Sequence, residues 1–233
     1  MKAKQFTAEF IGTFALVFAG CGAIVVDQTY GGAIGHQGIS LVFGLIVMAM
    51  IYSIGNISGA HINPAVSIAF TLAGRFEKKM LLPYIFCQCA GAIAACLVLK
   101  LMFPEHSTLG STLPSGSVTQ SFIMEFILSF LLMFVIFNIS TGHMEKGIMA
   151  GVAVGGTVAL EAMLGGPVCG ASMNPARSIG PALISGNLEH LWLYIVAPIT
   201  GMLLAYPCCC LSQDGDCCSP SDETQQTEKK SCC

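Results

Sequence analysis

One triplet, asparagine–proline–alanine, occurs twice in this chain, at residues 63–65 and at residues 174–176. Asparagine is a preferred N-cap and proline suits the first helical position, so each triplet predicts the start of a helix. The first turn of a helix has unpaired N–H groups and carries roughly half a positive elementary charge. Such an end repels a cation, whereas a neutral molecule can accept hydrogen bonds from the asparagine amide. The candidate residues are Asn63, Pro64, Ala65, Asn174, Pro175 and Ala176.

The composition indicates where these helix starts must lie. Of the 233 residues, 54% are hydrophobic and 10% are charged, against about 25% charged in soluble domains. Charge-free stretches at 10–26, 37–60 and 126–142 approach or exceed the ~20 apolar residues that cross a bilayer as a helix. We therefore expect an all-α integral membrane protein. The net charge of −3, without any basic run, argues against a nucleic-acid partner.

Hydropathy and helix-breaking residues divide the chain into long and short helices. Two apolar segments begin at the prolines, 64–73 and 175–184, and each is roughly ten residues or about 15 Å long, half of a ~30 Å hydrocarbon core. Irregular backbone at membrane depth is tolerated only where protein buries it or where it lines a watery cavity. The pattern therefore predicts a pore. Six further segments are long enough to span the membrane, at 6–26, 38–57, 80–102, 119–139, 147–165 and 189–207.

The two halves of the chain repeat each other. The segment EFIGTF at 9–14 returns as EFILSF at 125–130. Similarly, SGAHINPAVSIAF at 58–70 aligns with CGASMNPARSIGPAL at 169–183. Each half carries three spans and one short helix, so the second half must enter the membrane from the opposite side. The two short helices are therefore expected to meet near the bilayer midplane.

The repeat also sets the expected domain boundaries. We expect one channel-like domain over 1–207, made of inverted repeats at about 5–102 and 119–207. The segment FAGC at 18–21 resembles the end of a cleavable leader. Because the residues before it belong to the repeat, we interpret the first apolar segment as a span instead.

Basic residues favour one orientation in the membrane. Most of them fall on one side if both termini face the cytoplasm, as the positive-inside rule requires. These residues are Lys2, Lys4, Arg75, Lys78, Lys79 and Lys146. Lys100 falls on the other side. We expect a multi-pass protein of the plasma membrane with both termini cytoplasmic.

These features resemble the aquaporin, or major intrinsic protein, family over residues 5 to about 207. The paired motifs HINPAV at 61–66 and SMNPAR at 172–177 carry the resemblance, together with the repeat headed by glutamate. The stretch GGPVCGASMNPARSIGPA at 165–182 is most similar to the nodulin-26-like channels of plants and their bacterial relatives. The resemblance implies a homotetrameric channel in lipid for water and small neutral solutes, without catalysis and without a cofactor.

The same resemblance implies a selectivity filter outward of the two asparagines, formed by one residue of the second span, one of the fifth and two of the second loop. These roles fall on Phe43, Ala162, Ala171 and Arg177. Because two of these walls are only methyl groups, we expect passage of glycerol-like polyols, and we extend the hypothesis to undissociated metalloid acids such as arsenous or boric acid. Ser178 and Ala182 match the water-channel pattern instead, which leaves a water-selective aquaporin as the alternative.

Three polar residues near the broken segments are expected to support the loops. Glu9 and Glu125 occupy matching positions in the two repeats and are interpreted as acceptors that hold the loops. His61 is interpreted as a bracing residue rather than a pore ligand. A coupled transporter, the less favoured alternative, would need a titratable cluster at the midplane, and these two acids are its only candidates. Glu161 fits no pattern, and it would question the solute assignment if it lined the pore beside Ala162.

Residues 208–233 form a polar, cysteine-rich tail that we expect to be disordered and cytoplasmic. Its cysteines are Cys208, Cys209, Cys210, Cys217, Cys218, Cys232 and Cys233. In a reducing compartment we expect free thiols rather than disulfides. Such thiols suit a soft metal or trivalent arsenic, whereas acylation near the membrane and a tail without any ligand are the alternatives. A metal-sensing membrane protein built on this tail is a third functional class, but it would not need the paired triplets.

Overall fold

The structure is a computed structural model that describes residues 2–140 and 144–212, without the side chains of 144–147. Its helices are α1 (Lys2–Thr29), α2 (Gly35–Ser58), α3 (Pro64–Leu72), α4 (Lys78–Met102), α5 (Val118–Ile139), α6 (Met144–Cys169), α7 (Pro175–Ser185) and α8 (Leu193–Ser212). No strand occurs in the described residues, and six of these helices are long and apolar enough to cross a membrane. The expected all-α membrane fold, with six spans and two short helices, is confirmed.

Three long helices differ most from the expected boundaries: α1 and α6 extend further at both ends, and α8 is shifted toward the C-terminus. Helix α6 continues past the expected end at 165 to Cys169, with Pro167 inside its last turn. Proline has no N–H, so the carbonyl of Met163 loses its partner within the helix. His36 of α2 replaces that partner, because its Nε2 donates to the Met163 carbonyl at 2.8 Å. The helix can therefore run through the proline.

Helix α8 also differs from its expected range of 189–207. It begins at Leu193, because turns that include the bond from the N–H of Leu193 to the carbonyl of His190 precede it. It ends at Ser212, beyond the expected start of the tail at 208, and Cys209 in its last turns is buried in the core. The first residues of the predicted tail thus belong to a membrane-length helix.

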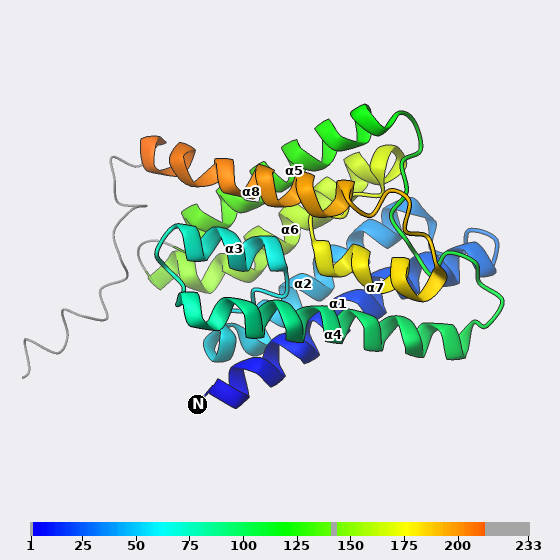
Figure 1. Cartoon of the computed structure of the whole chain (residues 1–233), viewed down its shortest axis with the longest axis horizontal. Coiled ribbons are helices and arrows are strands. Elements are labelled where there is room, and N and C mark those ends of the chain that lie inside the picture. The colour runs from blue at the N-terminus through cyan, green and yellow to red at the C-terminus, as the bar shows by residue number, and fades with distance from the viewer. Residues whose placement is uncertain (1, 141–143, 213–233) are drawn as a thin grey trace, which may run out of the picture.

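The long helices form a bundle with the two short helices inside it (Figure 1). Helix α1 packs against α2 and α4, α5 packs against α6 and α8, and α2 meets α6 where the two halves join. Helix α3 contacts α4 and α8, and α7 contacts the same two long helices. The short helices lie toward opposite ends of the bundle, as Figure 1 shows. Each short helix therefore contacts at least one long helix of the first half and one of the second half.

Glycines allow the long helices to approach closely at these crossings. A Cβ on Gly155 of α6 would lie 2.6 Å from the carbonyl oxygen of Gly44 on α2. Gly91 of α4 and Gly201 of α8 touch the backbones of α1 and α5 in the same way. Small residues at such crossings provide the close van der Waals packing that holds membrane helices together. This packing fixes the frame around the interior.

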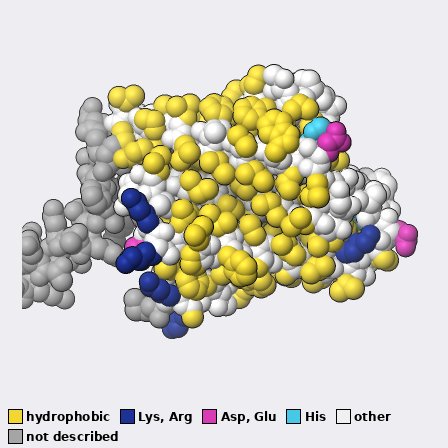
Figure 2. Space-filling view, in the orientation of Figure 1, with side chains coloured by type: hydrophobic (Ala, Val, Ile, Leu, Met, Phe, Trp, Pro, Cys, Tyr) yellow, Lys and Arg dark blue, Asp and Glu magenta, His cyan; other side chains and the backbone are white. Residues whose placement is uncertain are grey.

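The outer surface is that of a membrane protein. Figure 2 shows apolar side chains over most of the visible face, with lysine, arginine and acidic side chains gathered toward its two ends. Leu82, Phe86 and Leu101 of α4 are each about three-quarters or more exposed, at 75%, 74% and 82%. A soluble monomer rarely exposes an apolar surface of this extent. Such a surface is typical of an integral membrane protein.

Candidate functional site

Both short helices begin at the residues that the sequence indicates. The side chain of Asn63 caps α3 by accepting from the N–H of Ala65 at 2.9 Å. The side chain of Asn174 caps α7 by accepting from the N–H groups of Ala176 at 3.0 Å and Arg177 at 3.4 Å. Pro64 and Pro175 occupy the first helical turn, and they are buried with the alanines that follow them.

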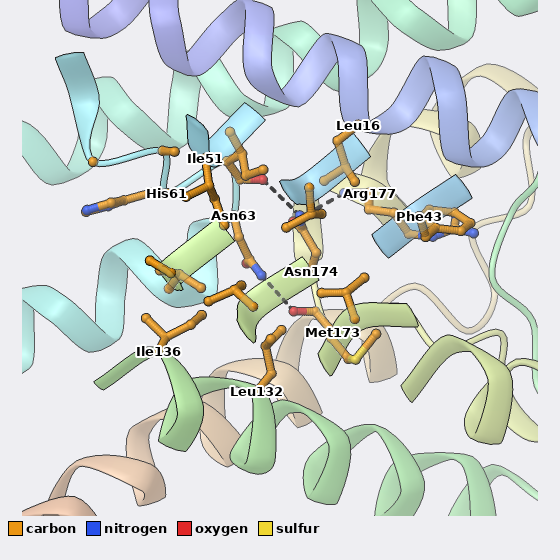
Figure 3. A pocket seen from close by; sticks show the side chains of 18 of the residues that line it. Leu16, Phe43, Ile51, His61, Asn63, Leu132, Ile136, Met173, Asn174 and Arg177 are labelled. Carbon is orange, nitrogen blue, oxygen red and sulfur yellow. Dashed lines mark hydrogen bonds between the residues drawn. The ribbon is translucent and has the colours of Figure 1, made fainter. Parts of the chain in front are cut away.

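The two asparagines also tie the two loops to each other. Nδ2 of Asn63 donates to the carbonyl of Met173 at 2.8 Å, and Nδ2 of Asn174 donates to the carbonyl of Ile62 at 2.9 Å. These reciprocal bonds join residues from opposite halves, and Figure 3 shows the two side chains side by side. An amide nitrogen has two hydrogens. Each asparagine therefore keeps one donor for a molecule in the cavity.

The loops before the short helices have a strained backbone. Ala60 and Ile62 in the first loop have φ values of 47° and 42°, and Ala171 and Met173 in the second have 43° and 52°. A left-handed conformation costs a residue with a side chain roughly 1–2 kcal/mol. Such strain persists only where the surrounding structure over-determines it. The two buried glutamates supply that constraint.

Glu9 lies behind the first loop and accepts four hydrogen bonds. One carboxylate oxygen accepts from Ser58 Oγ at 2.7 Å and the His61 N–H at 2.9 Å, and the other accepts from the Ile62 N–H at 2.7 Å and Gln88 Nε2 at 2.8 Å. The side chain is fully buried. Every one of these bonds holds the loop or its neighbour α4 in place.

Glu125 lies behind the second loop in the same way. Its two oxygens accept from the N–H groups of Ser172 at 2.7 Å and Met173 at 2.9 Å. The hydroxyl of Ser172 lies 2.6 Å from that of Ser178, which in turn lies 2.7 Å from the hydroxyl of Thr112. Ser178, which follows the water-channel pattern in the sequence, thus makes contacts within the protein that hold the loop.

His61 stands partly in the cavity and partly in an aromatic cluster. Its Nδ1 lies 3.0 Å from the Ser67 hydroxyl. Its ring packs against Phe70, Phe76 and Tyr84, with centroids 5.0, 4.7 and 5.3 Å away. These contacts fix the ring against α3 and α4. The side chain also borders the cavity.

One elongated cavity of about 150 Å³ passes both asparagines. In Figure 3 it extends from Ile136 near one end, past Asn63 and Asn174, to Phe43 at the other. A water molecule needs about 10–15 Å³ of such space, so the cavity has room for several waters. Its lining comes from both halves and is mostly apolar. The polar side chains in it are those of His61, Asn63, Ser140, Ser172, Asn174 and Arg177.

The four predicted filter residues, Phe43, Ala162, Ala171 and Arg177, all border this cavity. The guanidinium of Arg177 lies over the ring of Phe43, 5.1 Å from its centroid. Its Nη1 donates to the carbonyl of Gly110 at 2.7 Å and to the sulfur of Cys21 at 3.4 Å. Its Nε is buried and has no hydrogen-bond partner among the described residues. The guanidinium group is therefore anchored on one side, and its Nε–H has no acceptor among the described residues.

Sequence reasoning missed Gly110 and Cys21. Gly110 lies in the linker that joins α4 of the first half to α5 of the second half. The sequence signal at this position is the glycine itself. Its φ of +74° lies in the left-handed region, which a residue without a side chain adopts readily. The thiol of Cys21 gives no signal in the sequence beyond its place in the FAGC segment.

Glu161 does not border the cavity. Its side chain is buried, and neither carboxylate oxygen has a hydrogen-bond partner among the described residues. An unpaired charge at this depth would be very costly, so the carboxyl is expected to be neutral. The residue therefore does not count against a neutral-solute filter.

The cysteine tail gives little support to a metal site. Cys208 is a free cysteine, whereas Cys209 and Cys210 are disulfide-bonded, so the prediction of free thiols is wrong for these two. A disulfide removes the thiolates that a soft metal would bind. No cluster of three or more candidate metal ligands occurs in the described residues. The remaining candidates, Cys217, Cys218, Cys232 and Cys233, lie outside the residues that the structure describes.

Known proteins share both the sequence and the fold. Residues 1–206 match the family described as "Major intrinsic protein". The chain is 47% identical to Aquaporin NIP1-1 of Zea mays over 199 residues, 85% of this chain and 71% of that protein. It is 50% identical to Aquaporin NIP3-1 of Arabidopsis thaliana over 208 residues, 86% of this chain and 64% of that protein. This chain thus spans about two-thirds of the length of these plant relatives.

A solved structure agrees with these matches. The X-ray structure of the aquaglyceroporin from Plasmodium falciparum superposes with a TM-score of 0.76 at 26% identity, and covers 88% of this chain and 94% of that chain.

Proposed function

Because the chain belongs to the major intrinsic protein family, we propose that it is a passive transmembrane channel for water and small neutral solutes. The observation that carries the proposal is the cavity along which the two short helices, which lie toward opposite ends of the bundle (Figure 1), present their capped N-termini. Both asparagine amides border this cavity and keep a free N–H. A molecule with oxygen acceptors can therefore replace its lost hydration there.

Ions are excluded by the same arrangement. Each short helix contributes roughly half a positive charge at its N-terminus, and Arg177 adds a full one at the filter. A cation or hydronium that loses water in an apolar passage gains nothing from these groups, as half-helix dipoles exclude protons in aquaporin-type pores. Neutral solutes do not meet this electrostatic barrier.

The solutes proposed for this filter are water, glycerol-like polyols and undissociated metalloid acids such as arsenous or boric acid. Ala162 and Ala171 provide two small walls, and Phe43 provides an apolar wall for the carbon side of a polyol. Arg177 borders the cavity, and its guanidinium supplies a donor for the hydroxyls of the polyol. A water-selective aquaporin is the alternative, and solute flux distinguishes the two.

A coupled transporter is less compatible with the site. Its coupling groups would have to exchange ions or protons during transport. Glu9 and Glu125 already accept hydrogen bonds from the loops, so their ionisation is tied to the folded structure. Neither borders the cavity.

We further propose that the protein is a homotetramer in the plasma membrane with both termini cytoplasmic, and that its two halves are inverted repeats. The ends of the described chain at Lys2 and Ser212 lie at the same end of the bundle, as does the α3–α4 loop with Arg75 (Figure 1). The positive-inside rule then supports the orientation. The family resemblance alone supports the tetramer.

Stopped-flow light scattering of proteoliposomes tests the proposal. The panel is water, glycerol, urea and arsenous acid, with protein-free vesicles as the control. We expect water and glycerol permeation down their gradients without a proton current. Solute uptake against a gradient that is driven by pH or sodium would refute the channel, and water flux without glycerol flux would leave the water-selective alternative.

A further inference from the structure

A short stretch of α1 lies directly behind two walls of the filter. It contains Gly20 and Cys21, which end the FAGC segment that resembles a leader cleavage site. Gly20 backs Phe43, and Cys21 backs Arg177. Both residues are buried, and neither borders the cavity itself. They touch the filter from the side that faces away from the solute.

Gly20 leaves the space that the Phe43 ring occupies. A Cβ at this position would lie 2.5 Å from both Cδ1 and Cζ of the ring. Real Cβ atoms are not found so close to another heavy atom, so any side chain at Gly20 would displace the ring. Displacement away from α1 moves the ring toward the lumen. Glycine at this position thus determines how far Phe43 withdraws from the passage.

Cys21 closes a triangle with Arg177 and the linker. Its sulfur accepts from Arg177 Nη1 at 3.4 Å, and its thiol donates to the Gly110 carbonyl at 3.9 Å. The same carbonyl accepts from Nη1 at 2.7 Å. Both hydrogens of Nη1 therefore have protein acceptors. The guanidinium cannot swing into the lumen or toward α1 without breaking one of these bonds.

The linker can reach this position only because its residue is glycine. A Cβ on Gly110 would lie 3.0 Å from Cβ and 3.1 Å from Cα of Cys21. The backbone of the linker therefore rests directly on α1 at the cysteine. The sulfur fills the corner between the linker and Arg177.

We propose that Gly20 and Cys21 are positioning residues that set the solute size limit of the filter, Gly20 through the Phe43 ring and Cys21 through Nη1 of Arg177. This proposal rests on the proposed channel function and deepens it. It predicts opposite changes in selectivity from two adjacent residues. Simple close-packing positions would lower all fluxes together.

The test compares glycerol flux with water flux in proteoliposomes for paired variants. Gly20→Ala is paired with Gly22→Ala, because the nearest atom to a Cβ on Gly22 is a side-chain atom of Leu99 at 3.4 Å, an ordinary contact. Cys21→Ala is paired with Cys89→Ala, a free cysteine of α4 that packs against the same core cluster. Cys21→Ser is the conservative variant that keeps an acceptor and a donor. The folded fraction of each variant is measured by size-exclusion chromatography.

We expect Gly20→Ala to lower the glycerol-to-water ratio by about tenfold, the order of effect that one methylene has on discrimination by a fitted pocket. Cys21→Ala should raise the ratio by about threefold, because the guanidinium loses one of its two anchors and can retreat toward α1, and Cys21→Ser should return it toward the wild-type value. Gly22→Ala and Cys89→Ala should leave the ratio unchanged.

An unchanged ratio in Gly20→Ala and Cys21→Ala, or a shift of equal size in the control variants, would overturn the positioning roles. If the wild-type protein passes water but no glycerol, the proposed solute class fails instead. The positioning roles are then read from water flux at equal folded protein, which Gly20→Ala should reduce several-fold relative to Gly22→Ala. Equal water flux in those two variants would overturn the role of Gly20 in that case as well.

Discussion

The two halves of the molecule support their short helices in the same way but line the passage differently. In the first half the hydroxyl of Tyr84 donates to the Ser58 carbonyl at 2.9 Å, and in the second that of Tyr194 donates to the Cys169 carbonyl at 2.7 Å. A glutamate lies behind each loop, and an asparagine begins each short helix. The repeated residues are thus mainly those of the scaffold.

The lining departs from this symmetry at the filter. Three residues after each asparagine stand Val66 and Arg177, and both border the cavity. Only the second carries a charge, and only it is bonded to the linker. An inverted repeat by itself would give the same solute environment from both sides. We therefore expect selectivity to reside in the positions where the repeat is broken.

The support is also unequal in strength. Glu9 accepts four hydrogen bonds, including one from Gln88, whereas Glu125 accepts two from the backbone and one from the side chain of Cys169. The first loop should therefore depend more on its glutamate than the second. Mutation of the two glutamates tests this difference between the halves.

The largest effect is expected for Glu9→Gln. A glutamine at this position keeps one of the two carboxylate oxygens and replaces the other with an NH₂ group. The two donors that bonded to the replaced oxygen then lose their acceptor, and each unsatisfied donor costs about 1–3 kcal/mol of folding free energy. Glu125→Gln orphans one such donor and should cost about half as much. The measurement is the free energy of unfolding in detergent together with water flux. Equal losses in the two variants would contradict the inequality of the two supports.

The next largest effect should come from Arg177→Val, which copies Val66 into the second half. The change removes the charge and most of the side-chain volume from the filter, so glycerol and urea fluxes should rise relative to water by about tenfold. Val66→Ala is the matched control, because it changes the lining without touching the filter and should leave the ratio close to that of the wild type. If Arg177→Val leaves the solute-to-water ratio unaltered, the filter does not lie at this residue.

A smaller and more selective effect is expected for Ala162→His. The imidazole fills the space left by a methyl wall and adds a polar group, so glycerol flux should fall about tenfold more than water flux. Ala162→Ser, which stays small, serves as the control. A folding defect would lower both fluxes together. The ratio at equal folded protein therefore decides whether this position lines the filter.

Much of this arrangement could be predicted from the sequence because its signals are local or repeated. The caps at Asn63 and Asn174 follow from two adjacent residues, and the spans follow from apolar length. The contacts of Arg177 could not be predicted, since its partners Gly110 and Cys21 lie 67 and 156 residues away in the chain and follow no periodicity. Such tertiary contacts depend on which backbones the glycines allow to meet.

The end of α8 was misjudged for a related reason. Pro207 and the run of cysteines after it suggest a break, yet the helix continues to Ser212. Cys209, one of the two disulfide-bonded cysteines, is fully buried in the core. Packing against the bundle thus overrides the local helix-breaking signal. The composition predicts that the tail starts at 208, because composition carries no information on the packing of Cys209 in the core.

The smallest effect is expected from removing the extension that follows α8, for which the first half offers no counterpart. Deleting 213–233 leaves every described helix intact, so water and glycerol fluxes should stay within about twofold of the full chain. Deleting 208–233 also removes the last turn of α8 and the buried Cys209, and should lower the folded fraction. Flux per folded protein is compared in the two truncations and the full chain. A several-fold loss of flux in the shorter deletion would show that the cysteine-rich tail takes part in conduction. It would favour a metal-sensing membrane protein built on this tail over a channel that works without it.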